Sequence, residues 1–150
     1  MSSSFYVKDL LIKKLDNDCF VSAQIELSMI EEISKSGINL IVSNRLEGES
    51  FDQPTDLELL NQSKLYSVEF KSVPFSGSSL TREKIDHFSQ ILKESNGGNL
   101  LYCKSGFRSA IIWGLSEVLN YNKEVEPVAQ IVNSCGYDSS TIFSLVDFFR

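Results

Sequence analysis

The residues best suited to chemistry lie in the stretch CKSGFRS, which runs from Cys103 to Ser109. It follows the apolar run NLLY and precedes a segment with a helical pattern. In an open α/β sheet, the loop after a strand lies at the start of a helix, where unpaired N–H groups and the helix dipole attract anions. The same surroundings favour the thiolate, which is the nucleophilic form of cysteine. The stretch therefore predicts a nucleophilic Cys103 in an anion-binding loop.

The other residues of this loop fit an anion site. Gly106 permits a tight turn or a positive φ, and Arg108 presents a planar cationic fork that matches tetrahedral oxyanions. The remaining loop residues offer N–H groups, hydroxyls or local positive charge, and they are Lys104, Ser105, Phe107 and Ser109. The simpler alternative is a packed cysteine with Arg108 as a solvated helix residue. That alternative leaves unexplained why a glycine, two serines and an arginine gather at one strand-to-helix junction.

Strand-like and helix-like segments alternate along the chain, which favours an α/β domain. Strands are predicted at 19–25, 38–44, 65–71 and 97–103, and helices at 28–37, 81–95, 108–119, 126–133 and 140–149. Another helix begins after Thr55, where Thr55 and Glu58 match a capping box, as do Ser28 and Glu31. Gly37 suits the C′ position of the 28–37 helix. We expect a three-layer αβα domain over residues 1–150, with a mostly parallel sheet of about four strands. Residues 1–17 form an N-terminal extension.

Composition excludes several functional classes. The 150 residues are 42% hydrophobic and 23% charged, which is typical of soluble globular proteins. A net charge of -6 argues against a nucleic-acid partner. No apolar run approaches the roughly 20 residues that span a bilayer, and the N-terminus has no signal-peptide pattern, so we expect no membrane partner and a cytoplasmic location. The three cysteines have neither disulfide-framework nor metal-ligand spacing, so no metal and no cofactor are expected.

The cysteine loop, followed by Trp113, resembles that of the phosphatase-like domain of beta-lactamase hydrolase-like proteins. This bacterial family is related in fold to dual-specificity phosphatases. The stretches VSAQI, INLIVSNRLEGESFDQPT and CGYD resemble other motifs of the family, so the similarity extends from Cys19 to Asp138. It implies a dual-specificity-phosphatase fold with Cys103 and Arg108 as catalytic residues. Tyr102 stands where the family usually has a histidine.

The loop favours sulfur chemistry over phosphate chemistry. Four residues separate Cys103 from Arg108, as in rhodanese sulfurtransferases, whereas tyrosine-type phosphatases place five there. The loop SVPFSGSSL, where such phosphatases carry an acid, has no Asp, Glu or His to protonate a leaving group. Sulfite needs little protonation to leave. The expected function is therefore a sulfurtransferase, in which Cys103 takes sulfur from a thiosulfate-type or persulfide donor and passes it to a thiol acceptor.

Two alternatives stay open. The first is a phosphatase that hydrolyses a phosphate ester through a cysteinyl-phosphate at Cys103. The loop RLEGESFDQP would then supply Arg45 as a second cation and an acid from Glu47, Glu49 or Asp52. Otherwise these carboxylates are solvated and Arg45 pairs with one of the glutamates. The second alternative is a non-catalytic anion-binding or redox-sensing module.

Three further residues are given no role in chemistry, namely His87, Cys19 and Cys135.

Overall fold

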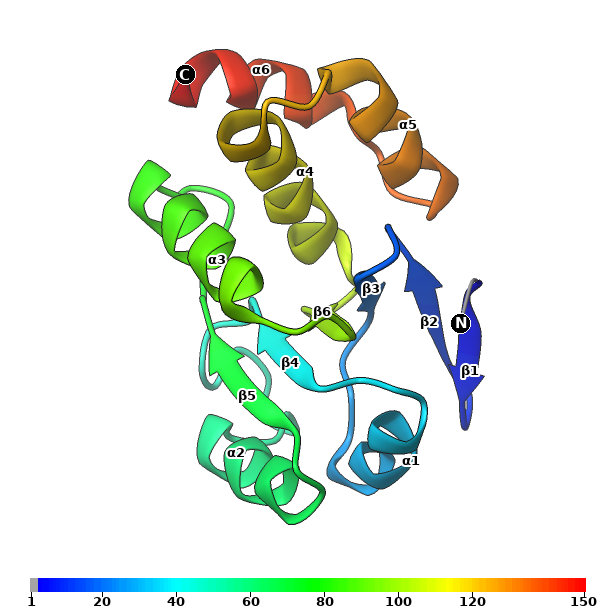
Figure 1. Cartoon of the computed structure of the whole chain (residues 1–150). Helices are drawn as coiled ribbons and strands as arrows, with labels where there is room; N and C mark the ends of the chain where they lie inside the picture. Colours follow the sequence, from blue (N-terminus) through cyan, green and yellow to red (C-terminus); the bar gives the residue numbers. More distant parts are fainter. Residues whose placement is uncertain (1–2) are drawn as a thin grey trace.

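A single mixed sheet organises the computed structural model, which describes residues 3–150 (Figure 1). Its six strands lie in the order β1-β2-β3-β6-β4-β5. Their bounds are Phe5–Val7, Leu10–Lys14, Cys19–Ser22, Leu40–Ser43, Glu69–Ser72 and Asn99–Tyr102 for β1 to β6. The last four strands are parallel to one another, and the first two join as an antiparallel hairpin. The carboxyl ends of β3, β4, β5 and β6 therefore meet at one edge.

The expected αβα fold is confirmed, but the sheet has six strands instead of about four. The two additional strands come from the N-terminal extension. Val7, Leu10 and Ile12 are buried in the hairpin, which pairs with the edge of β3 through residues 13 and 14. The pairing of this short segment depends on the distant strand that it meets, and strand pairing is a tertiary contact that a local pattern does not specify.

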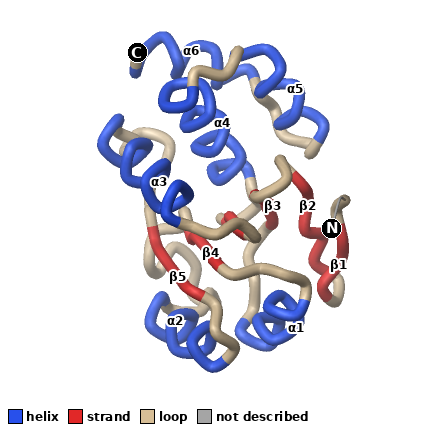
Figure 2. The backbone as a smooth tube through the Cα atoms, in the orientation of Figure 1, coloured by secondary structure: helices blue, strands red, loops and turns tan. Residues whose placement is uncertain are grey.

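Helices cover both faces of the sheet, as the tube view shows (Figure 2). One face carries a short 3-10 turn at Leu27–Met29, α1 (Ile30–Lys35) and α2 (Asp56–Leu65). The other face carries α3 (Arg82–Glu94), α4 (Phe107–Tyr121), α5 (Val125–Ser134) and α6 (Ser140–Phe149). Successive residues of β6 alternate between the two cores: Leu100 and Tyr102 face α1 and α2, while Leu101 faces α3 and α4. In residues 3–150, none of these helices combines the length and the apolar character needed to cross a membrane.

Local sequence patterns predicted the positions of most of these helices and strands. The Thr55–Glu58 capping box is present, and Gly37 has a φ of 95° after α1, as predicted. The prediction of a capping box at Ser28 is wrong, because a 3-10 turn occupies this point and α1 begins at Ile30 without a side-chain cap. The strand predicted from residue 65 starts at Glu69, because α2 continues through Leu65.

Candidate active site

Cys103 lies directly after β6, at the carboxyl edge of the central parallel strands. Its side chain is 1% exposed, yet it belongs to neither of the two apolar core clusters. The Cys103 Sγ instead accepts a hydrogen bond from the Gly106 N–H at 3.1 Å. A thiol held by a backbone donor at the base of a strand-to-helix loop is in a position to act as a nucleophile.

Gly106 makes the turn between this cysteine and α4. Its φ is 99°, a conformation that residues with a Cβ rarely adopt. A Cβ at this position would also overlap the hydroxyl of Tyr137. The Tyr137 Oη donates to the Ser105 carbonyl at 2.9 Å, so it holds the loop from the outside. The expectation of a special backbone conformation at Gly106 is confirmed.

Arg108 lies in the first turn of α4 and reaches across to two loops. Its Nη1 and Nη2 donate to the two carboxylate oxygens of Glu49, with an Nη2–Oε2 distance of 2.9 Å. Nη1 also donates to the Phe75 carbonyl at 2.9 Å. The hydrogen bonds that Arg108 donates to Glu49 raise the pKa of Arg108, and its interactions with Cys103 act in the same direction. The guanidinium is therefore fixed beside the thiol.

Arg45 holds the Glu49 loop. Its side chain is 4% exposed, and its Nε donates to Glu49 Oε2 at 2.8 Å. Its Nη1 donates to Gln24 Oε1 at 2.7 Å, and its Nη2 donates to Ser50 Oγ at 2.6 Å. Of the two interpretations left open, the structure favours the ion pair with Glu49. All three guanidinium nitrogens of Arg45 have protein partners, so its role as a second substrate cation stays a prediction.

Glu49 is poorly suited to donate a proton. Hydrogen bonds from Arg108 and Arg45 lower its pKa to about 2, against an opposing effect of burial. The carboxyl is therefore ionised at neutral pH, which is wrong for a general acid. It acts instead as the bridge between two guanidinium groups.

The other two loop carboxylates lie away from this bridge. Both oxygens of Glu47 accept from the Asp56 N–H, at 3.2 and 3.1 Å, at the start of α2. Asp52 is exposed and lines a cleft of about 500 Å³ together with Gln24 and Lys104. No hydrogen bond to Arg108 or Cys103 is found for either residue among the described residues, so neither is positioned as the acid.

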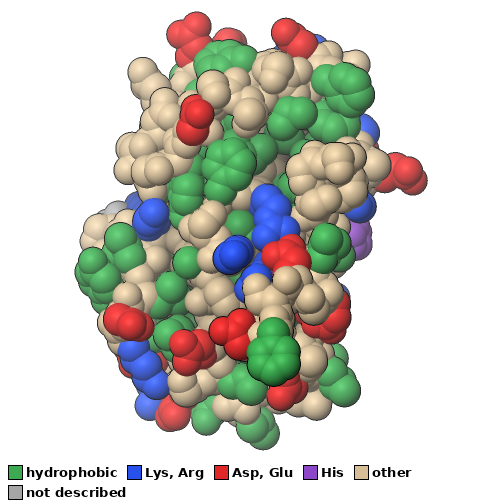
Figure 3. Space-filling model, turned by 180° about the vertical axis from the view of Figure 1, so that it is seen from behind, with side chains coloured by type: hydrophobic (Ala, Val, Ile, Leu, Met, Phe, Trp, Pro, Cys, Tyr) green, Lys and Arg blue, Asp and Glu red, His purple; other side chains and the backbone are tan. Residues whose placement is uncertain are grey.

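The remaining loop residues divide into a buried one and exposed ones. Ser109 is buried, and its Oγ donates to Asn44 Oδ1 at 2.7 Å. This contact ties α4 to the end of β4, and the place of Ser109 in the anion-binding loop stays a prediction. The exposed side chains are those of Lys104, Ser105 and Phe107. On the face seen in Figure 3, Lys and Arg side chains gather near the centre, with an acidic group against them.

Tyr102 is a buried member of the core on the α1 and α2 face. Burial raises its pKa to about 12, despite hydrogen bonds to Ser43 and Gln24 that act the other way. Because strand side chains alternate, its phenol lies on the opposite face of β6 from Leu101. Tyr102 therefore packs in the core at the position where the family usually has a histidine.

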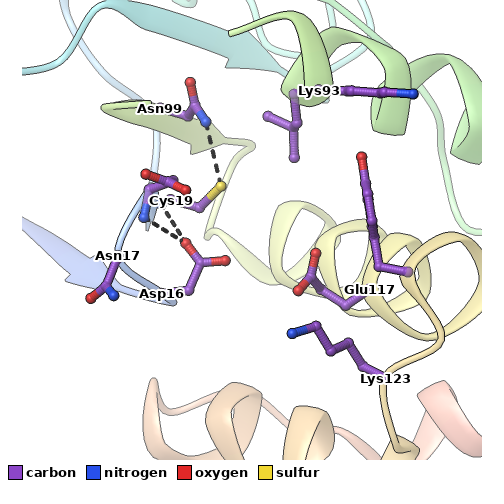
Figure 4. Close-up of a pocket in the computed structure, with 10 residues that line it drawn as sticks. Asp16, Asn17, Cys19, Lys93, Asn99, Glu117 and Lys123 are labelled. Carbon is purple, nitrogen blue, oxygen red and sulfur yellow. Dashed lines mark hydrogen bonds between the residues drawn. The ribbon is translucent and has the colours of Figure 1, made fainter. Parts of the chain in front are cut away.

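The other cysteines are not part of this site. Cys19 begins β3 at the opposite end of the sheet, beside a pocket lined by Asp16, Lys93 and Glu117 (Figure 4). Burial raises the pKa of its thiol, and Asn99 Nδ2 lies 3.6 Å from its sulfur. The Cys135 Sγ donates to the Lys14 carbonyl at 3.4 Å. His87 is exposed on α3. That none of these residues carries chemistry stays a prediction.

Sequence reasoning gave no role to three residues that shape the site. Gln24 accepts from Arg45, Asn44 accepts from Ser109, and Tyr137 donates to Ser105. Asn44 and Tyr137 stood within motifs that resembled the family, which was the available signal. Gln24 likewise lay within VSAQI, which resembled the family, but the partner of its side chain depends on contacts between loops that are distant in the chain.

Comparison with known protein families agrees with this geometry. The model of the family described as beta-lactamase hydrolase-like protein, phosphatase-like domain, matches residues 11–120. The chain belongs to this family. The resemblance drawn from the cysteine loop is thereby confirmed.

The relatives of this beta-lactamase hydrolase-like domain fall into curated proteins and solved structures. A beta-lactamase hydrolase-like protein of Xylella fastidiosa is 25% identical over 118 residues, which cover 79% of this chain and 27% of the relative. The chain thus spans about a quarter of the length of the curated relatives it matches. A candidate phosphatase of Neisseria meningitidis is 22% identical, with a TM-score of 0.80 over 91% of this chain and 96% of that one. PTPMT1 in complex with PI(5)P is 15% identical, with a TM-score of 0.73 over 91% and 93%. At these identities the solved structures establish the phosphatase-like fold.

Proposed function

We propose that this domain hydrolyses phosphate monoesters through a cysteinyl-phosphate on Cys103. The observation that carries the proposal is the hydrogen bond from the Gly106 N–H to the Cys103 sulfur, in the loop that leads to the fixed guanidinium of Arg108. A backbone donor and a planar cation beside a nucleophile suit a tetrahedral anion. The phosphatase-like fold and a structural neighbour that holds a phosphoinositide add support. The phosphatase alternative of the sequence analysis thus becomes the main hypothesis.

The reaction has two displacements at phosphorus. The Cys103 thiolate attacks the phosphorus, the S–P bond forms, and the ester P–O bond breaks with its electron pair on the leaving oxygen. Water then attacks the phosphorus, the S–P bond breaks, and inorganic phosphate leaves with the thiolate restored. Arg108 and the loop N–H groups hold the phosphoryl oxygens in both steps.

The protonation of the leaving group comes from solvent in this proposal. Glu49 is ionised between two guanidinium groups, and the SVPFSGSSL loop carries no acid. Without a placed donor, an ester with a weakly basic leaving group reacts faster than one that must expel an alkoxide. We therefore expect a steep dependence of kcat/KM on the pKa of the leaving phenol.

Sulfur transfer is the second candidate, because the same absence of a placed acid favours it. Cys103 would attack the outer sulfur of thiosulfate, and the S–S bond would break with its electron pair on sulfite. A thiolate acceptor would then attack the sulfane sulfur and carry it away as a persulfide. The loop with four residues between Cys103 and Arg108 also supports this candidate.

The test measures hydrolysis of a series of aryl phosphates, and cyanide-dependent thiocyanate formation from thiosulfate, on the same protein. Phosphate release should fall by about three orders of magnitude or more in Cys103→Ser, as is usual when a nucleophile is removed. It should fall roughly a hundredfold in Arg108→Lys, which loses the fork geometry. Cys135→Ser is the matched control and should keep wild-type activity.

The outcomes separate the two chemistries. Trapping of one phosphoryl group on wild-type protein but not on Cys103→Ser supports the phosphatase proposal. Thiocyanate formation that depends on Cys103, with no phosphate release from any ester, would replace it with sulfur transfer. Hydrolysis that survives in Cys103→Ser contradicts both.

A further inference from the structure

We propose that an apolar pocket beside Arg108 binds the organic group of the substrate. It would select phosphate esters with small apolar groups over polyhydroxylated ones. This inference rests on the proposed function for the position of the phosphoryl group, but its test measures binding and not turnover. The pocket was not among the residues singled out from the sequence.

Three segments that are distant in the chain build this pocket. The loop between β5 and α3 contributes Phe75, Gly77 and Leu80, and the start of α4 contributes Phe107 and Ile111. Helix α6 contributes Ser144 and Leu145 from the far side. Its volume is about 250 Å³.

Among residues 3–150, Arg108 is the only charged one that lines the pocket. The same guanidinium interacts with the Cys103 thiol and donates to the Phe75 carbonyl on the pocket wall. A phosphoryl group held at Cys103 and Arg108 thus has an apolar cavity next to it. The two binding surfaces share one arginine, which fits a ligand with an anionic head and an apolar body.

The opposite side of the site has a different character. The cleft of about 500 Å³ there has a mixed lining, in which Ile25, Leu27 and Pro54 lie among the charged side chains of Glu26, Arg45, Asp52 and Lys104. Four of the residues that line this cleft are charged, whereas the pocket beside α6 has Arg108 as its charged neighbour. Polar groups placed in the apolar pocket would lose hydrogen bonds to water. The chemistry of the two sides therefore directs an apolar group toward α6.

The pocket is large enough for a small organic group. An engineered protein cavity of about 150 Å³ holds a benzene molecule, so about 250 Å³ accommodates a ring or a short alkyl chain. Each methylene moved from water into such a site contributes about 0.8 kcal/mol, which is about three- to fourfold in affinity. Sugar and inositol phosphates lack this contribution.

The experiment titrates the full chain with n-alkylphosphonates from ethyl to octyl by calorimetry, because phosphonates cannot be hydrolysed. The Kd should tighten about three- to fourfold for each added carbon until the pocket is filled. Glucose 6-phosphate, whose phosphate also sits on a primary carbon, should bind about tenfold more weakly than hexylphosphonate or weaker still.

Two variants of α6 test the assignment to this pocket. Ser144→Phe fills the cavity from an exposed position, and Leu145→Ser makes one wall polar. Both should flatten the dependence on chain length while ethylphosphonate still binds as it does to wild type. Phe148→Ser is the matched control, because Phe148 is an exposed residue on the same helix outside the pocket.

The dependence on chain length decides the inference separately from the proposed function. The pocket is overturned if the phosphonate Kd does not change with chain length, even if aryl phosphates are hydrolysed. It is also overturned if Ser144→Phe leaves the dependence of Kd on chain length at its wild-type value. If wild-type Kd depends on chain length and Ser144→Phe abolishes this dependence, the pocket is supported even if no ester is turned over. A failure of every phosphonate to bind contradicts both proposals.

Discussion

At the scale of single residues, the site is governed by one carboxylate between two guanidinium groups. Glu49 accepts from Arg108 and Arg45, and its side chain is only 18% exposed. Buried charge pairs are costly to break because the remaining partner loses both water and its counter-ion. Glu49 is therefore a positioning residue for Arg108, and not a source of protons.

The first prediction concerns Glu49→Gln. Gln lacks the second acceptor oxygen, so Arg108 loses its fixed orientation and kcat/KM for aryl phosphates should fall about tenfold to a hundredfold. The decrease should be similar at every pH, because no proton donor is removed. A general-acid role would instead abolish one limb of the pH–rate profile. Glu69→Gln, at an exposed position on β5, should keep wild-type activity.

The same variant should change the pH dependence of stability. The Glu49 pKa falls from 4.5 to about 2 on folding, so its stabilising effect is complete above pH 4.5 and is lost as the pH falls toward 2. Between about pH 6 and pH 3, wild-type protein should lose more of its free energy of unfolding than Glu49→Gln. Urea unfolding at both pH values measures this difference, and equal losses would contradict it.

At the scale of elements, the site depends on the junction of β6 with α4. Gly106 gives this junction its positive φ, and Tyr137 packs against it from the segment between α5 and α6. The turn therefore depends both on backbone freedom and on the space that a neighbouring segment leaves.

The second prediction is that Gly106→Ala destabilises the fold by about 1–3 kcal/mol, because of the positive φ and the overlap with the Tyr137 hydroxyl. It should also weaken ethylphosphonate binding, since the loop N–H groups move. In a Tyr137→Phe background, which removes the overlapping hydroxyl, the same substitution should cost less. Urea unfolding of the four proteins gives the coupling, and strictly additive effects would contradict the proposed overlap.

At the scale of the whole molecule, the N-terminal hairpin supports the region around the site from a distance. Lys13 on β2 donates to the Cys135 carbonyl at 2.8 Å, and its Nζ lies 4.4 Å from the ring centroid of Tyr137. Tyr137 in turn holds Ser105 of the cysteine loop. A contiguous set of contacts thus joins the first strands, the C-terminal helices and the site.

The third prediction is that Lys13→Met lowers the free energy of unfolding by about 1.5–3 kcal/mol, because it removes a charge-assisted hydrogen bond. It should also reduce kcat/KM for aryl phosphates, by less than Gly106→Ala does, because Tyr137 loses a neighbour. Lys71→Met, at an exposed position on β5, is the control. Unchanged stability in Lys13→Met would show that the hairpin does not support the C-terminal segment.

Much of this architecture could be predicted because its causes are local. The Thr55–Glu58 capping box, the turn at Gly106 and the apolar strands before Asn44 and Cys103 depend on neighbouring residues. The position of Cys103 then follows from the rule that loops of a parallel sheet meet at the carboxyl edge. The sequence by itself thus determined the family, the nucleophile candidate and the loop that holds it.

Only the tertiary structure decided what those residues do together. Glu49 and Arg108 are 59 positions apart, and Ser109 and Asn44 are 65 apart. The apolar pocket likewise needs α6 to pack beside the start of α4. Side chains so far apart in the chain meet only after the whole sheet and its helices have packed. The ionised state of Glu49, the engagement of Arg45 and the apolar neighbour of Arg108 are therefore properties of the folded molecule.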